Sequence, residues 1–163
     1  MSELERFKRA QDSPDSGFAT ALAELRAGRK KSHWIWYVFP QLSGLGRSES
    51  SRIYGIADAD EATEYLRDSV LRGRLLMGAT TVLKHQRAGV PLPRLMGASI
   101  DVLKLVSSLT LFGQIARSLD ANEANDEYRR LADVAAQILS GAESEGYPRC
   151  RHTLRLLERQ PSL

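Results

Sequence analysis

Apolar side chains recur every three or four positions along most of this 163-residue sequence, a spacing that gathers them on one side of an α-helix. Cap and stop signals divide the pattern into segments. Asp58 is followed three residues later by Glu61, as in a capping box, and Gly28 and Gly89 stand where helices commonly end. We predict helices that begin at Ser16, Ser48, Asp58, Ser69, Ser99 and Asn122, and a last one around residues 154–157.

The segment His33-Trp-Ile-Trp-Tyr-Val-Phe39 is the one stretch whose residue types favour a β-strand. A lone strand would leave its backbone N–H and C=O groups without partners, and no second strand is evident in the sequence. We therefore predict a short buried helix that ends at Pro40. The chain as a whole is expected to be all-α, with about seven or eight helices packed around this aromatic segment.

The composition is that of an ordinary globular protein, with 42% apolar and 26% charged residues. We expect a single domain over residues 1–163, with an ordered core over about 4–158 and a short C-terminal tail. The single cysteine, Cys150, has no partner for an internal disulfide, which favours the reducing cytoplasm. No apolar stretch approaches the roughly 20 residues that cross a bilayer, so we expect no membrane association.

A helical wheel divides the aromatic segment into two sides. Trp34 and Phe39 belong to the more apolar side, whereas His33, Trp36 and Tyr37, each with a polar group on its ring, share the other. In one interpretation all these rings form the centre of the core, and the backbone satisfies their polar atoms. In the other, the second side is the wall of a ligand pocket, where the rings offer a stacking surface and His33 a proton or a hydrogen bond.

The turn Gln41-Leu-Ser-Gly-Leu-Gly-Arg-Ser48 is a second candidate site. Gly44 and Gly46 allow a tight backbone and the close approach of a ligand. Ser48 is placed to cap a helix, and Arg47 could pair with a phosphate or carboxylate. The turn has neither the lysine of a Walker loop nor the third glycine of a Rossmann fingerprint. A connecting turn followed by an ordinary cap is the alternative interpretation.

Asp101, Lys104 and Ser108 form a polar stripe on an otherwise apolar helix. In a structural interpretation Asp101 pairs with Lys104, and Ser108 bonds back to its own helix. In a functional interpretation the stripe enters the same pocket as His33.

Two other ligand classes are disfavoured. His33, His85 and His152 are remote from one another in sequence, so we expect no metal site and no cofactor. The basic residues 29–31 lie beside the aromatic segment, as in some nucleic-acid-binding proteins, but acidic residues elsewhere nearly cancel their charge and leave a net charge of +3. A solvated loop is the simpler interpretation, and we expect no nucleic-acid partner.

Several sequence blocks together resemble the signature of a bacterial and fungal family, domain-of-unknown-function family 1810. The main blocks are His33–Gln41, Gly44–Ser48, Arg52–Asp58 and Lys104 with Ser107-Ser108. The resemblance implies a small all-α single domain with no established biochemical activity. Some members carry a calpastatin-like label, although calpastatin is largely disordered and this chain has the composition of a compact protein.

The sequence therefore supports a hypothesis of ligand binding. We expect a small polar or anionic, nucleotide-like ligand in a pocket formed by the aromatic segment and the glycine turn, with His33 as the candidate acid–base. The expected contact residues are His33, Trp36, Tyr37, Gln41, Gly44, Gly46, Arg47, Ser48, Asp101, Lys104 and Ser108. One alternative is a protein-interaction module without a ligand, and another is a hydrolase or transferase that acts on such a ligand. We expect a monomer, with a dimer as the alternative.

Overall fold

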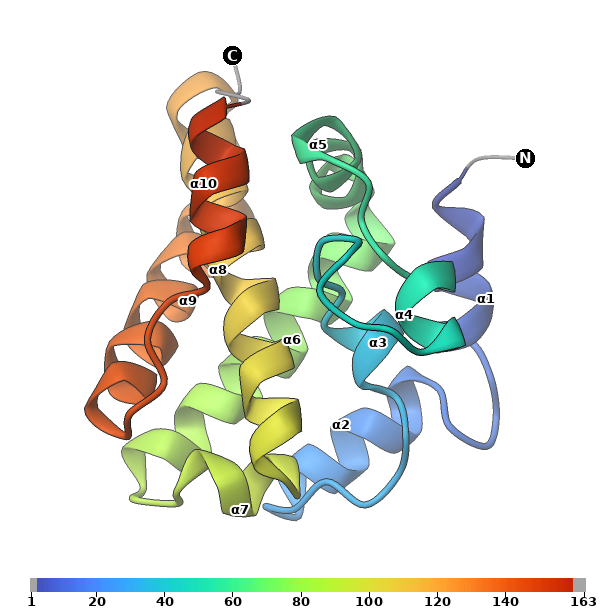
Figure 1. Ribbon diagram of the computed structural model, residues 1–163, viewed down its shortest axis with the longest axis vertical. Helices are drawn as coiled ribbons and strands as arrows, with labels where there is room; N and C mark the ends of the chain where they lie inside the picture. The colour runs from blue at the N-terminus through green and yellow to red at the C-terminus, as the bar shows by residue number, and fades with distance from the viewer. Residues whose placement is uncertain (1–2, 160–163) are drawn as a thin grey trace.

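The computed structural model describes residues 3–159, and this part of the chain is all-α, as the sequence predicts (Figure 1). Within it, ten helices follow one another: α1 (Glu5–Gln11), α2 (Phe18–Arg26), α3 (Ile35–Val38), α4 (Glu49–Ile53), α5 (Ala59–Arg67), α6 (Ser69–Arg87), α7 (Leu92–Met96), α8 (Ser99–Asn122), α9 (Asp126–Ser144) and α10 (Arg151–Arg159). The short helices α1 and α7 are additional to those predicted. Residues 1–2 and 160–163, the ends of the expected domain, lie outside the described residues.

The 24-residue helix α8 runs through the middle of the molecule. Helix α9 packs along one side of it, and α5, α7, α10 and α3 contact its remaining surface (Figure 1). By length and composition α8 is the one described helix that could cross a membrane. However, 61% of its most apolar stretch is buried inside the protein. Its buried apolar residues, from Val102 to Leu119, therefore form the centre of the core.

Some helix starts agree with the sequence and others are shifted. Asp58 caps α5, as predicted, because its Oδ1 accepts a hydrogen bond from a backbone N–H of the first turn. Asp68 rather than Ser69 caps α6, since its carboxylate accepts two N–H groups there. Helix α8 continues through Asn122, and Asn125 caps α9 instead. At the starts of α6 and α9, a nearby side chain accepts the free backbone N–H groups that the predicted cap residue was expected to satisfy.

The aromatic segment forms the predicted short buried helix. Its regular part is the four-residue α3, and Pro40 follows shortly after. Trp34 lies immediately before α3 and Phe39 immediately after it; both are buried, and their ring centroids are 6.3 Å apart. The more apolar side of the segment is therefore core, as the helical wheel indicates.

Glu24 on α2 holds the chain that leads into this segment. Its Oε1 accepts hydrogen bonds from the backbone N–H groups of Lys31 and Ser32, at 2.7 and 2.8 Å, and from Trp34 Nε1 at 3.0 Å. The Ser32 hydroxyl donates to Oε2 at 2.5 Å. Burial by itself raises the pKa of Glu24, but these bonds outweigh it and lower the pKa from 4.5 to about 2.

We expect Glu24→Gln to lower the free energy of unfolding by about 2 kcal/mol at pH 7. Because the folded pKa is depressed, the carboxylate stabilises the fold fully above pH 4.5, and this contribution is lost as the pH falls towards 2. Urea unfolding at pH 7 and pH 3 should therefore show the difference between variant and wild type shrinking at the lower pH. The exposed Glu158→Gln serves as the control, and a difference independent of pH would contradict the role of Glu24.

A closed loop carries the glycine turn to the N-terminal half of α8. Residues Leu42 and Ile56 form an isolated parallel bridge. There Ser43 N donates to Ile56 O at 2.8 Å, and Ile56 N donates to Gln41 O at 2.9 Å. These bonds join the two ends of the 41–56 loop, which contains both the glycine turn and α4. The loop is thereby closed on itself as one unit.

Candidate ligand-binding site

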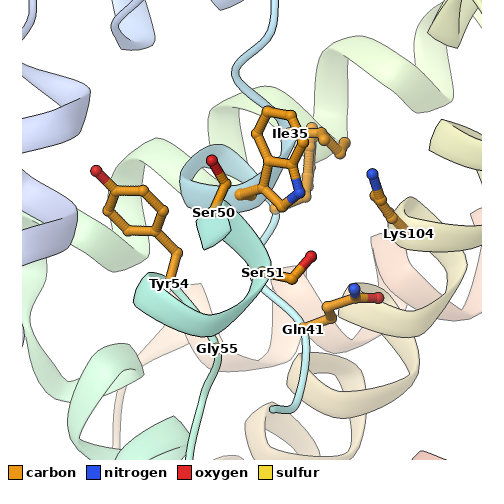
Figure 2. Close-up of a pocket in the computed structure, with 9 residues that line it drawn as sticks. Ile35, Gln41, Ser50, Ser51, Tyr54, Gly55 and Lys104 are labelled. Carbon is orange, nitrogen blue, oxygen red and sulfur yellow. The ribbon is translucent and has the colours of Figure 1, made fainter. Parts of the chain in front are cut away.

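A groove with a volume of about 410 Å³ lies between the 41–56 loop, α8 and residues 148–150, which connect α9 to α10. We call it the α8 groove. Its lining consists of Gln41, Leu45, Gly46, Arg47, Ser48, Ser51, Ile100, Leu103, Lys104, Val106, Ser107, Pro148 and Cys150. A small bay of about 10 Å³, lined in part by Trp36, shares Gln41, Ser51 and Lys104 with the groove. Figure 2 shows these three shared residues around one space, with the Tyr54 hydroxyl pointing away from it.

The loop wall depends on glycine and on a serine cap. A Cβ atom on Gly46 would lie 2.2 Å from Ser51 Oγ, so only glycine lets the turn approach α4 this closely. Ser48 caps α4, as predicted, by accepting the Ser51 N–H at 3.1 Å, and its hydroxyl donates to Ser51 Oγ at 2.9 Å. Gly44 has a φ of +90° and forms the exposed bend of the turn. The turn therefore presents residues 45–48 to the groove.

Residues 148–150 form the third wall of the groove, and Cys150 connects this wall to α8. Its backbone N–H donates to Thr110 Oγ1 at 3.3 Å, and Thr153 Oγ1 donates to its sulfur at 3.2 Å. Cys150 is a free, half-buried thiol, and Pro148 beside it is exposed. The only cysteine of the chain thus lies in the groove lining.

The α8 wall is one continuous face of the helix. Ile100, Leu103, Lys104 and Ser107 are spaced i, i+3, i+4 and i+7, so they follow one another along the same side. Lys104 Nζ lies 4.7 Å from the centroid of the Trp36 ring, where a cation–π interaction is favourable. Lys104 therefore stands between the groove and the bay.

The charge of the site is unbalanced. The linings of the groove and the bay include two cations, Arg47 and Lys104, and contain no Asp or Glu. Asp101 lies 3.8 Å from Lys104 Nζ, but its closer partner is Lys30, at 2.8 Å. An anion in the groove would therefore meet positive charge without a competing carboxylate in the lining.

Two buried polar atoms at the site have no hydrogen-bond partner among the described residues: Ser107 Oγ and Trp36 Nε1. Ser107 is 3% exposed. Thr110, three residues further along α8, donates back to Val106 O at 2.7 Å, but Ser107 makes no such bond. An unpartnered buried hydroxyl costs about 1–3 kcal/mol, so Ser107 Oγ is an unused hydrogen-bonding group beside the groove.

Six of the eleven predicted contact residues come together at the groove or the bay, namely Trp36, Gln41, Gly46, Arg47, Ser48 and Lys104. The other five, His33, Tyr37, Gly44, Asp101 and Ser108, lie outside both linings. The predicted site is therefore displaced from the aromatic segment towards the glycine turn and α8.

The helical wheel groups His33, Trp36 and Tyr37 together, but the structure separates them. Only four residues of the segment are regular helix, so the wheel does not apply to His33, which precedes α3 and is exposed. Tyr37 lies outside both linings, and its hydroxyl donates to Ser16 O at 2.6 Å. Trp36 alone of the three reaches the site.

The predicted polar stripe on α8 is also divided. Asp101 pairs mainly with Lys30, a residue of the basic cluster that we expected to be solvated. Ser108 is fully buried, and its Oγ has no partner among the described residues, so the expected bond back to its own helix is not made. Of the stripe, only Lys104 contributes to the lining.

Several residues of the groove lining are not among the eleven predicted contact residues. Ser107 follows Lys104 by one helical turn, so the α8 periodicity contains a signal for it. Ile100 and Leu103 precede Lys104 on the same face. Pro148 and Cys150 come from a distant part of the chain, and nothing local in the sequence indicates that they meet this loop.

The arrangement is suited to holding a ligand. It supplies two cations and the hydroxyls of Ser48, Ser51 and Ser107 along one groove. The lining contains no His, Asp or Glu, so it places no carboxylate or imidazole for general acid–base work there. Within residues 3–159, no three His, Cys, Asp or Glu side chains gather as metal ligands would.

Comparison with known proteins identifies the family. The chain is similar to the crystal structure of the conserved hypothetical protein Rv1873 from Mycobacterium tuberculosis, with 34% sequence identity over 96% of each chain and a TM-score of 0.72. The comparison with curated proteins gave no match. A family model described as a protein of unknown function, DUF1810, matches residues 1–134, a range that includes the loop and α8 walls of the groove and ends before residues 148–150. The chain belongs to the DUF1810 family, as the resemblance of its sequence blocks indicates.

Proposed function

We propose that this protein binds a small organic anion in the α8 groove, with its charged group held between Arg47 and Lys104. One observation carries the proposal: the groove has two cations and a buried, unpartnered hydroxyl, Ser107 Oγ, with no carboxylate in its lining. A carboxylate or phosphate supplies both the negative charge and the acceptor oxygens that such a lining lacks.

The size and polarity of the groove support a small molecule. Its volume of about 410 Å³ falls within the ~300–1,000 Å³ range of ligand pockets. Ser48 and Ser51 add hydroxyls on the wall that faces α8. A nucleotide-like anion is one class that the charge pattern would accept. We also propose a cytoplasmic location, in which the free Cys150 stays reduced.

Because Cys150 is the only cysteine and lies in the groove, its alkylation rate reports on the site. We expect phosphate, short carboxylates or nucleoside monophosphates to slow labelling of Cys150 by iodoacetamide and to raise Tm. Arg47→Ala and Lys104→Ala should weaken this protection about ten- to a hundredfold, the loss typical of a hydrogen bond to a charged group. Arg52→Ala, which removes an exposed cation of α4 outside the lining, is the matched control.

All comparisons are made at matched ionic strength, because phosphate stabilises many proteins without binding a site. Equal protection of wild type and Arg47→Ala would contradict the proposal. So would a panel in which no anion slows labelling of Cys150.

A second candidate function, a protein-interaction module, is favoured by a face of α6. Val70 and Met77 are large exposed apolar residues seven positions apart on this helix, and they line a shallow surface groove together with Arg26, Arg74 and Arg130. This interpretation becomes the leading one if no anion binds the α8 groove.

A further inference from the structure

We infer that the anion is amphipathic: a carboxylate or phosphate that carries an unbranched aliphatic chain, with the chain lying along α8 towards the N-terminal end of that helix. The inference rests on the proposed function and names the class of ligand for the same groove.

Polarity changes along the α8 wall. Ile100 and Leu103, at its N-terminal end, are neighbouring large apolar side chains that are 58% and 50% exposed. Lys104 and Ser107 follow one turn later. The rise of a helix separates Ile100 from Ser107 by roughly 10 Å, so one extended molecule could meet the apolar and the polar half together.

The opposite walls continue the apolar half. Leu45 from the glycine turn and Pro148 from the connection to α10 line the same groove. Together with Ile100 and Leu103 they surround the space with aliphatic atoms. An aliphatic chain removes these atoms from water, whereas a second charged or strongly polar group would be desolvated there without partners.

The ring at the site is not open for stacking. Lys104 Nζ lies over one face of the Trp36 ring, 4.7 Å from its centroid, and so competes with a nucleobase for that face. The bay beside Trp36 has a volume of about 10 Å³, close to the room that one water molecule needs. The organic part of the ligand is therefore directed to the aliphatic walls, and the charge on Lys104 remains available to the anionic group.

The test is a series of straight-chain carboxylates and alkyl phosphates of increasing length, used below their micelle-forming concentrations. Their Kd values are obtained from protection of Cys150 and from calorimetry. We expect Kd to fall about fourfold for each methylene that reaches the apolar walls, which corresponds to ~0.8 kcal/mol per buried CH₂. Adenosine monophosphate should bind no more tightly than an alkyl phosphate of four carbons.

Two variants distinguish the contribution of the ligand's aliphatic chain from that of its charged group. Leu103→Ser should flatten the dependence on chain length, whereas Arg47→Ala should weaken every member of the series by a similar factor. Met77→Ser is the matched control, because Met77 is a comparably exposed apolar residue on α6 outside the groove. Leu103 is half exposed, so the Leu103→Ser protein is expected to fold, which its Tm verifies.

The outcomes are distinguishable. If phosphate protects Cys150 but Kd does not depend on chain length, the inference of an aliphatic chain is overturned and the proposed anion site is retained. If adenosine monophosphate binds more tightly than the alkyl phosphates, the inference of an aliphatic chain is overturned and a nucleotide becomes the ligand class. Failure of every anion to bind removes the proposed function itself. If phosphatidylglycerol vesicles retain the protein but the monomeric ligands do not bind, the partner is a lipid surface rather than a single ligand. This result would also overturn the inference.

Discussion

Replacing Trp34 with alanine should lower the free energy of unfolding by about 3–5 kcal/mol, the cost typical of removing a large buried ring. Trp34 is 0% exposed and packs against Phe39. Its Nε1 donates to Glu24 Oε1 at 3.0 Å, and Lys30 Nζ lies 5.0 Å from its ring centroid. The substitution therefore removes apolar burial, a hydrogen bond and a cation contact at one point.

Denaturant unfolding of purified Trp34→Ala measures this loss. Total stabilities of 5–15 kcal/mol are usual for single domains, so the variant is expected to be poorly folded or to unfold at a much lower denaturant concentration. His33→Ala is the matched control, since His33 is the exposed neighbour of Trp34, and it should change stability by less than about 0.5 kcal/mol. An unchanged midpoint for Trp34→Ala would show that this ring does not support the core.

The second large effect is expected at the buried ion pair between Lys30 and Asp101. The two atoms, Lys30 Nζ and Asp101 Oδ2, are 2.8 Å apart, and the side chains are 5% and 14% exposed. Lys30 Nζ also donates to Ser32 O at 2.6 Å. Lys30→Met should cost about 3–5 kcal/mol, because it leaves the Asp101 carboxylate in a poorly hydrated place, with Lys104, at 3.8 Å, as its remaining ion-pair partner among residues 3–159.

A double variant distinguishes the penalty of an unpaired charge from a simple loss of packing. Lys30→Met combined with Asp101→Leu should be more stable than Lys30→Met alone, because no charge is then left unpaired. Arg129→Ala, which breaks the exposed pair with Asp126 at 3.7 Å, should cost less than about 1 kcal/mol. A double variant that is less stable than the single one would show that the charges themselves are not the main contribution.

The sequence predicts the local features of the site well. The glycine turn, the Ser48 cap and the short helix of the aromatic segment all depend on interactions within a few residues, and all three are observed. The helical wheel of that segment failed for His33, because a single turn of helix is too short to extend its periodicity to a flanking residue, and for Tyr37, whose hydroxyl donates to the backbone of Ser16 instead. The shifted cap at Asp68 has a similar cause, since two neighbouring residues could both accept the same N–H groups.

The amino-acid sequence by itself determined that this chain is helical, that Trp34 and Phe39 are buried, and that Gly46, Arg47 and Ser48 stand together in one turn. These are consequences of helical periodicity and turn chemistry, which act over about four residues. Only the tertiary structure decided which distant groups meet. It paired Asp101 with Lys30 and placed Cys150 opposite the glycine turn. It also left the Ser107 hydroxyl unpartnered in the groove. The physical reason is that the packing of α10 and the 41–56 loop on α8 joins residues far apart in the sequence, and no local pattern records those contacts.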